Sequence, residues 1–272
     1  MHAGMAMTAP TALTIAGSDS SGGAGIQADL KTFAALGVYG ASVITALTAQ
    51  NTVGVRGVHH VPPEFITAQI DAVFSDLRVD AVKIGMVAQL ANIDAIAAGL
   101  ARWSPRHVVL DPVMVATSGD RLLAPDAVDA LRTTLIPNAS LITPNLPEAA
   151  ALLDEPVAET RSAIESQGRR LLRMGCPAVL IKGGHGHGAE SVDYLIRDNG
   201  IVAISAPRIV TRNTHGTGCS LSSAIAAGLA KGEEMETALR NAKAWVSAAI
   251  DAADRLGVGL GHGPIHHFHR FY

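Results

Sequence analysis

Short apolar runs alternate with amphipathic stretches along most of this chain. The apolar runs are rich in β-branched residues, as in strands that are buried on both faces. The longer stretches repeat apolar residues every three or four positions, as in a helix packed on a core. The predicted strands cover residues 12–16, 81–84, 107–110, 141–143 and 178–181, and the predicted helices cover residues 25–36, 88–103, 217–230 and 233–256. This alternation predicts an α/β fold with a mostly parallel sheet covered by helices.

Two pairs of β-rich runs predict hairpins, and a further helix is predicted between these pairs. The first pair, residues 38–48 and 53–61, flanks a turn-like segment and should form a small β flap. The second pair, residues 192–197 and 201–205, flanks Asp198-Asn199-Gly200, which is a strong turn sequence. The helix opens at Pro62-Pro63, where proline is well tolerated.

Composition limits the class of protein. The chain has 272 residues, of which 48% are hydrophobic and only 4% aromatic. This size suits one large α/β domain or two small ones, preceded by a flexible leader over residues 1–10. The leader lacks the pattern of a signal peptide, and no run of about 18 apolar residues predicts a membrane span. The net charge of -3, without a basic block, argues against a nucleic-acid partner.

Cysteine usage indicates the compartment. The chain has two cysteines, Cys176 and Cys219. They could form one disulfide, but two cysteines in a chain of this length do not make the framework of a secreted protein. We therefore expect a cytoplasmic protein.

Polar and glycine-rich segments follow the predicted strands. They include Gly17-Ser18-Asp19, Gly85-Met86, Asp111-Pro112, Thr143-Pro144-Asn145 and Lys182-Gly183-Gly184. Because ligands of open parallel sheets bind at the carboxyl ends of the strands, this clustering predicts one long cleft at that edge.

The most informative segment lies at residues 214–220, where Gly216-Thr217-Gly218-Cys219 runs into a helix of small residues. The N-terminus of a helix presents free backbone N–H groups and favours an anion. Cys219 stands in the first turn, where the same field would favour its thiolate. Taken alone, the segment also fits a packed turn in which Cys219 is a small apolar filler.

Three charged residues near strand ends fit phosphate chemistry. Asp111 is placed to hold Mg²⁺ or its water ligands, and Glu148 could join it or cap a helix. Lys182, beside flexible glycines, suits a nucleotide phosphate. The alternative is that Asp111 is a turn residue and Lys182 an ordinary strand-end lysine.

Other polar segments are less specific. The glycine-rich loop at residues 17–25 lacks the spacing of a dinucleotide site and the ending of a P-loop, and Asp29, one turn beyond it, could either face a ligand or lie on the surface. Histidines at positions 185, 187 and 215 are too loosely arranged for a zinc site. The histidine-rich tail at residues 262–269 contains glycine and proline that break helical ligand spacing, which favours a structural or exposed tail.

Taken together, these segments resemble the hydroxymethylpyrimidine/phosphomethylpyrimidine kinases of thiamine biosynthesis, within the ribokinase superfamily. The segments that carry the resemblance are residues 14–31, 46–51, 83–86, 111–114, 143–148, 215–219 and 261–264. The resemblance extends over nearly the whole chain. It implies a three-layer ribokinase-like fold in a single kinase domain over residues 11–272, and a homodimer. It also implies a kinase that uses ATP with Mg²⁺ to phosphorylate 4-amino-5-hydroxymethyl-2-methylpyrimidine and then its monophosphate.

The resemblance also implies roles for individual residues. Cys219 would be the catalytic base, although many ribokinase relatives carry an aspartate there, and Gly216, Thr217 and Gly218 would form the anion hole. The remaining roles are substrate binding by Gly17, Asp29, Gln50, Met86 and Val113, ATP binding by Lys182, Asn145 and Thr214, and metal binding by Asp111 and Glu148.

Two other functions fit parts of the pattern. A pyridoxal kinase shares the fold and transfers phosphate to a similar alcohol, but Gln50 and Met86 favour the pyrimidine. A non-catalytic vitamin-binding protein would require neither the Gly-Thr-Gly-Cys segment nor Asp111 and Lys182. A dehydrogenase is disfavoured because the dinucleotide fingerprint is missing.

Overall fold

A central sheet organises the computed structural model, which describes residues 8–115, 125–184 and 188–272. Its strands are β1 (Thr11–Ala16), β2 (Tyr39–Ile44), β5 (Ala81–Ile84), β6 (Val108–Leu110), β7 (Leu141–Ile142), β8 (Ala178–Ile181), β9 (Glu190–Arg197) and β10 (Gly200–Pro207). They lie in the order β10-β9-β8-β7-β6-β5-β1-β2, and the strands from β8 to β2 are parallel. The predicted mostly parallel sheet is thus confirmed.

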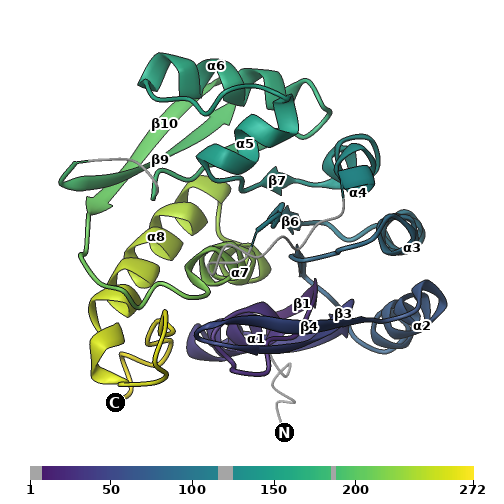
Figure 1. Ribbon diagram of the computed structural model, residues 1–272. Coiled ribbons are helices and arrows are strands. Elements are labelled where there is room, and N and C mark those ends of the chain that lie inside the picture. Colours follow the sequence, from purple (N-terminus) through teal and green to yellow (C-terminus); the bar gives the residue numbers. More distant parts are fainter. Residues whose placement is uncertain (1–7, 116–124, 185–187) are drawn as a thin grey trace, which may run out of the picture.

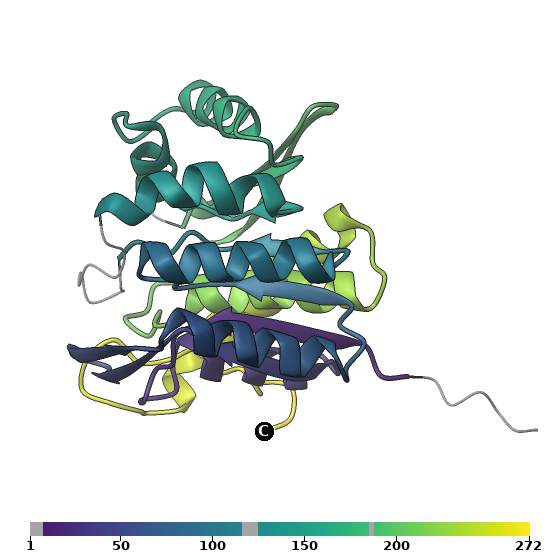
Figure 2. The same ribbon diagram turned by 90° about the vertical axis from the view of Figure 1, so that its right-hand side faces the viewer.

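Helices cover both faces of this sheet (Figures 1 and 2). One face carries α1 (Gly25–Ala35), α7 (Thr217–Ala230) and α8 (Met235–Asp251), and the other carries α2 (Pro63–Phe74), α3 (Leu90–Trp103), α4 (Pro125–Ala130), α5 (Leu146–Leu153) and α6 (Arg161–Leu172). A π turn (Leu131–Leu135) and a 3-10 turn (Ile136–Asn138) follow α4, and a 3-10 turn (Ala253–Arg255) follows α8. Apolar residues form a separate core on each face of the sheet, so the fold has three layers.

The two hairpins turned out differently. The hairpin of β9 and β10 around residues 198–199 is confirmed, with Arg197 paired to Gly200. The predicted flap over residues 38–61 was wrong in its first half, because β2 pairs in parallel with β1 at the edge of the central sheet. Only β3 (Ala46–Asn51) and β4 (Gly54–His60) form the separate hairpin.

Thr45 separates β2 from the flap. Its backbone N–H donates to the carbonyl of Ala16 and its hydroxyl to the carbonyl of Met86. The chain therefore first forms β2, which pairs with the edge of β1 that β5 leaves open. It leaves the sheet only at Thr45. The flap then rises from the carboxyl ends of the strands, which face the viewer in Figure 1.

No helix within the described residues is long and apolar enough to cross a membrane.

Candidate active site

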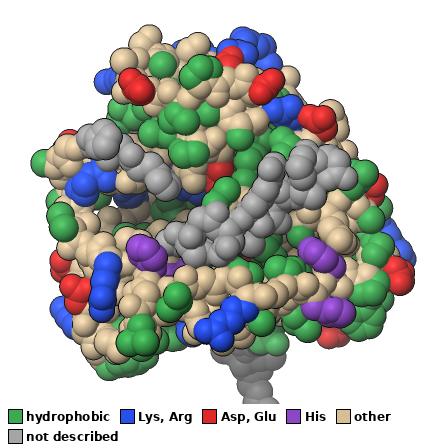
Figure 3. All heavy atoms as spheres, in the orientation of Figure 1, with side chains coloured by type: hydrophobic (Ala, Val, Ile, Leu, Met, Phe, Trp, Pro, Cys, Tyr) green, Lys and Arg blue, Asp and Glu red, His purple; other side chains and the backbone are tan. Residues whose placement is uncertain are grey.

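A cavity of about 860 Å³ opens at the carboxyl ends of the strands. The space-filling view of that face shows a hollow between the upper and lower parts of the molecule (Figure 3). Every residue predicted for the site lines this cavity except Asp29: Gly17, Gln50, Met86, Asp111, Val113, Asn145, Glu148, Lys182, Thr214, Gly216, Thr217, Gly218 and Cys219. The long cleft expected at the strand ends is therefore present.

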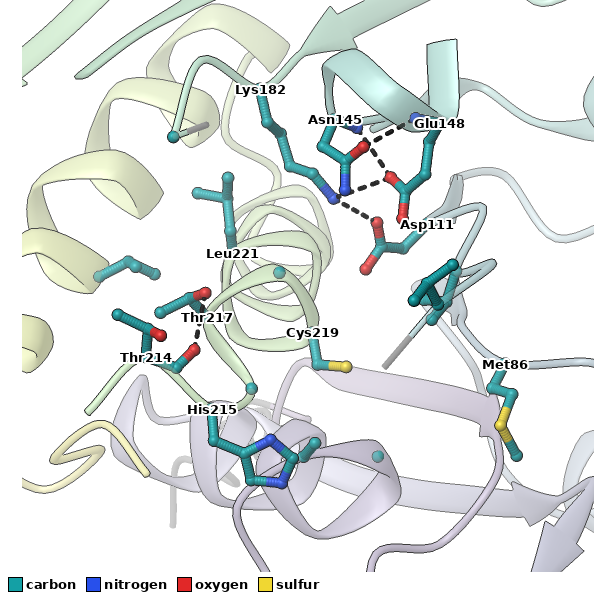
Figure 4. A pocket seen from close by; sticks show the side chains of 18 of the residues that line it. Met86, Asp111, Asn145, Glu148, Lys182, Thr214, His215, Thr217, Cys219 and Leu221 are labelled. Carbon is teal, nitrogen blue, oxygen red and sulfur yellow. Dashed lines mark hydrogen bonds and ion pairs between the residues drawn. The ribbon is translucent and has the colours of Figure 1, made fainter. Parts of the chain in front are cut away.

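Two carboxylates and a lysine meet at one end of the cavity (Figure 4). Lys182 Nζ lies 2.7 Å from Asp111 Oδ1 and 3.7 Å from Glu148 Oε2. Asp111 also accepts a hydrogen bond from Thr143 Oγ1 at 3.1 Å. These side chains come from the loops and helix that follow β6, β7 and β8, so neighbouring parallel strands bring them together.

Glu148 has the capping role that the sequence left open, whereas its role as a metal ligand stays a prediction. Asn145 and Glu148 form a capping box on α5, in which the carboxylate accepts from the Asn145 N–H at 2.7 Å and the Asn145 amide accepts from the Glu148 N–H at 2.8 Å. The same carboxylate also faces Asp111 and Lys182. The cap holds it in the cavity wall.

Burial and crowding set the charges of this cluster. Burial raises the pKa of Glu148 to about 7, with the Asp111 carboxylate adding to the rise and Lys182 opposing it. Burial would lower the pKa of Lys182, but Asp111 and Glu148 outweigh it and raise that pKa, so Lys182 is cationic. One lysine therefore faces two carboxyl groups, and the second remains partly protonated near neutral pH.

The N-terminus of α7 lies next to this cluster, because a Cβ on Gly218 would lie 3.5 Å from Lys182 Nζ and 3.6 Å from Asp111 Oδ2. Gly216 precedes the helix with φ +80°, and no side chain caps the first turn. The Thr217 hydroxyl donates to the carbonyl of Thr214 at 3.0 Å, which closes the loop. Because the first N–H groups of a helix have no partner within it, this end can accept an anion from the cavity.

Cys219 points from this first turn into the cavity (Figure 4). The expectation of a favoured thiolate was wrong for the free protein, because burial raises the pKa of Cys219 to about 11. Lys83 lowers that pKa, while Asp29 and Asp111 raise it further. Burial and the neighbouring carboxylates therefore outweigh the lowering of the Cys219 pKa that its place at a helix N-terminus led us to expect.

Asp29 does not line the cavity. It is fully buried and pairs with Lys83 Nζ at 2.8 Å, while the hydroxyls of Thr14 and Ser223 donate to it at 2.6 Å each. The predicted contact of Asp29 with a substrate is therefore not supported by this geometry. Helical spacing cannot show that a lysine 54 residues away occupies the carboxylate.

Among the residues that the structure describes, six ionisable cavity residues were missed as site residues. They are Asp19, Lys83, Asp193, Arg208, His215 and Lys243. His215 Nε2 lies 2.7 Å from Asp19 Oδ2. Asp19 already stood within the glycine-rich loop and His215 beside the anion loop, but nothing in a sequence reveals a contact between residues 196 positions apart.

The tail contains buried histidines as well as an exposed one, His262. His266 and His267 are buried, and His267 Nε2 lies 2.9 Å from Ser220 Oγ on α7. Burial lowers the pKa of His267 to about 3, so its ring is neutral. Within the described residues there is no group of three or more His, Cys, Asp or Glu side chains that could hold a metal. Residues 185 and 187 lie outside the described residues, as do residues 1–7 of the predicted leader.

Comparisons with known proteins show the family of this chain. The family model described as phosphomethylpyrimidine kinase matches residues 19–266. The hydroxymethylpyrimidine/phosphomethylpyrimidine kinase of Salmonella typhimurium is 58% identical, over 96% of this chain and 98% of the relative. Two solved structures are similar across most of both chains. The phosphomethylpyrimidine kinase of Clostridium difficile has a TM-score of 0.79 and 45% identity, over 88% of this chain and 99% of its own.

The second structure, an ADP complex of Bacillus subtilis pyridoxal kinase, has a TM-score of 0.88 and 35% identity, over 97% of this chain and 100% of its own. A family match over most of the chain and 58% identity at nearly full length go well beyond a shared fold. The chain belongs to the phosphomethylpyrimidine kinase family.

Proposed function

We propose that this protein uses ATP to phosphorylate 4-amino-5-hydroxymethyl-2-methylpyrimidine and then its monophosphate, as a step of thiamine biosynthesis. The observation that carries the proposal is a cavity in which an anion-binding helix terminus lies beside a lysine–carboxylate cluster. Gly17, Gln50, Met86 and Val113 line the same cavity. The Bacillus subtilis relative was solved with ADP, which supports a nucleotide in this cavity.

The first transfer moves one phosphoryl group. The substrate alcohol oxygen attacks the γ-phosphorus of ATP, the bond from that phosphorus to the bridging oxygen breaks, and ADP leaves with that oxygen. Lys182 and the N-terminus of α7 neutralise the charge of the transferring group. Cys219 can receive the alcohol proton as a thiolate, so its thiol must first release its own proton to bulk water, and the proton from the alcohol then restores the thiol.

The second transfer differs in its nucleophile, which is an oxygen of the monophosphate. That oxygen is already ionised at neutral pH and needs no base. Positioning and charge neutralisation are then sufficient.

Mg²⁺ is part of the same proposal. Asp111 and Glu148 supply hard carboxylate oxygens on one wall, which is the donor set that Mg²⁺ takes together with water and phosphate. The raised pKa of Glu148 fits this set, because a cation between the carboxylates would relieve their repulsion. When bound, the ion neutralises phosphate charge, and Lys182 and the capping box keep the two carboxylates in place.

An ADP-release assay with Mg²⁺ and ATP tests the proposal. The acceptors are the pyrimidine alcohol, its monophosphate and pyridoxal. We expect turnover with both pyrimidines. Turnover with pyridoxal alone would favour the pyridoxal kinase, whose case rests on the Bacillus subtilis relative. Tight pyrimidine binding without ADP release would indicate a non-catalytic binding protein.

Two further points belong to this proposal. We infer a homodimer, because the flap and its turn expose Leu47 (47%), Val53 (66%) and Val58 (41%) to solvent.

We also infer a cytoplasmic location, because Cys176 and Cys219 are both free thiols in the folded chain.

A further inference from the structure

A buried carboxylate holds the glycine-rich loop after β1 together. Asp19 Oδ1 accepts hydrogen bonds from the Ser21 N–H at 2.9 Å and the Ser21 hydroxyl at 2.7 Å. Asp19 Oδ2 accepts from the N–H groups of Gly23 at 3.1 Å and Ala24 at 2.8 Å. Asp19 therefore fixes the loop that leads into α1 and lines the cavity.

The same carboxylate oxygen reaches a second loop. His215 Nε2, at the edge of the anion loop, lies 2.7 Å from Asp19 Oδ2. Burial opposes ionisation of Asp19, but the hydrogen bonds from His215 and from its own loop outweigh it and lower the pKa of Asp19 to about 2. An ionised carboxylate only accepts, so Nε2 of His215 must carry the proton of this bond.

This assignment has a consequence for Gln50. Its amide nitrogen lies 3.5 Å from His215 Nε2, but a ring nitrogen that donates to Asp19 cannot also accept from Gln50. The Gln50 amide N–H groups thus stay available to the cavity, while its oxygen accepts from Thr48 Oγ1 at 3.2 Å.

The two loops also pack backbone against backbone. Gly216 adopts φ +80°, and a Cβ there would collide with the Gly23 carbonyl. A Cβ on Gly23 would in turn collide with the His215 ring. The glycine-rich loop at residues 17–25 and the anion loop at residues 214–218 therefore form one rigid unit. The Asp19–His215 hydrogen bond holds them together.

We propose that the Asp19–His215 pair sets the distance between the acceptor oxygen and the transferring phosphate. In this proposal Asp19 and His215 act through the two loops that they join, so both are positioning residues. This inference rests on the proposed function for the identity of the acceptor. Its physical basis is that a displacement of about 1 Å between reacting groups can cost about 100-fold in rate while each substrate still binds.

The test compares His215→Ala with His215→Gln in the full chain. The Gln side chain can place an N–H where Nε2 of His215 stands and so keep the bond to Asp19. We expect His215→Ala to lower kcat for the pyrimidine alcohol about 100-fold, with both KM values within about threefold of wild type. His215→Gln should recover at least about a tenth of the wild-type kcat. His262→Ala is the matched control, because that histidine is exposed and bonds only a backbone carbonyl through its ring.

Hydrogen exchange supplies a readout that requires no turnover. Amides of residues 216–219 should exchange faster in His215→Ala than in wild type and in His215→Gln, with no matching change across β5–β8. A kcat within threefold of wild type, a loss confined to KM, or unchanged exchange in His215→Ala would overturn the proposal. So would equal losses of kcat in the Ala and Gln variants.

Failure of the proposed function gives a different result. Wild-type enzyme would then release no ADP with the pyrimidine alcohol, whatever residue 215 is. In that case the same variants are compared with pyridoxal as the acceptor. The hydrogen-exchange experiment is carried out as before, because it requires no turnover. A normal wild type with an unaffected His215→Ala contradicts only the positioning role.

Discussion

At the scale of the residue, the charges in this cavity depend on neighbours that come from distant parts of the chain. Cys219 stands at a helix N-terminus, where a thiolate is ordinarily favoured, yet burial raises its pKa to about 11. Burial and the neighbouring Asp111 raise the pKa of Glu148 to about 7. Residue type and spacing identified both groups, but their protonation follows from side chains that only the fold brings near.

Cys219 should matter more for the first transfer than for the second. Its replacement by alanine removes a proton acceptor from the alcohol step, whereas the monophosphate oxygen is already ionised. We expect Cys219→Ala to lower the single-turnover rate with the alcohol at least tenfold more than the rate with the monophosphate, within the about 10²–10⁴-fold that a general base contributes. Equal losses in the two assays would rule out Cys219 as the base. Cys219→Ser is the control for packing, because it nearly keeps the size of the side chain while changing its acidity.

Glu148 should make stability depend on pH. Its pKa rises from 4.5 to about 7 on folding, so the folded state favours the protonated form. The protonated carboxyl stabilises the fold fully below pH 4.5, and this contribution is lost as pH rises through 7. It amounts to on the order of 3 kcal/mol. Glu148→Gln, which keeps the cap, should therefore unfold at a higher temperature than wild type at pH 8, with a smaller difference at pH 5.

Mg²⁺ gives the matching control for that comparison. A cation that binds the ionised carboxylates should raise the unfolding temperature of wild type at pH 8 and have less effect at pH 5. Glu148→Gln should lose most of this response. If Mg²⁺ stabilises both proteins equally at pH 8, Glu148 is not a metal ligand.

At the scale of the element, α7 connects the anion site to buried charges. Serines on this helix contact His267 through Ser220, at 2.9 Å, and Asp29 through Ser223, at 2.6 Å. The sequence predicted α7 and its anion-binding N-terminus from small residues and glycines. It did not predict what the helix packs on, because the partners lie on α1, β5 and the tail.

The Asp29–Lys83 pair should act on stability. Both side chains are fully buried at 2.8 Å separation, so removing one charge leaves the other without compensation. We expect Lys83→Met to lower the free energy of unfolding by about 3–5 kcal/mol. The double variant with Asp29→Asn should recover part of that loss, as measured by urea denaturation. A double variant no more stable than Lys83→Met would contradict the pairing.

At the scale of the whole molecule, the sequence predicted much of the fold, and its errors came from non-local contacts. Buried parallel strands such as β1 and β8 read as continuous apolar runs, and their order around the sheet places the predicted cavity. The β-rich run over residues 38–48 contains no break, so it read as one strand of a hairpin. The run is divided at Thr45 because its first part pairs with β1, and no local sequence pattern predicts that pairing.

That division places the flap where a second copy could cover it. β2 leaves the edge of the sheet open, with Tyr39 58% exposed, and β3 presents Leu47 on the side away from Thr48, which faces the cavity. An exposed apolar face of this kind costs solubility unless a partner buries it. We expect wild type to have the mass of a dimer in light scattering and Leu47→Asp to have that of a monomer. Arg56→Asp, another charge change at an exposed flap residue but without loss of apolar surface, should stay dimeric, and a monomeric wild type would refute the dimer.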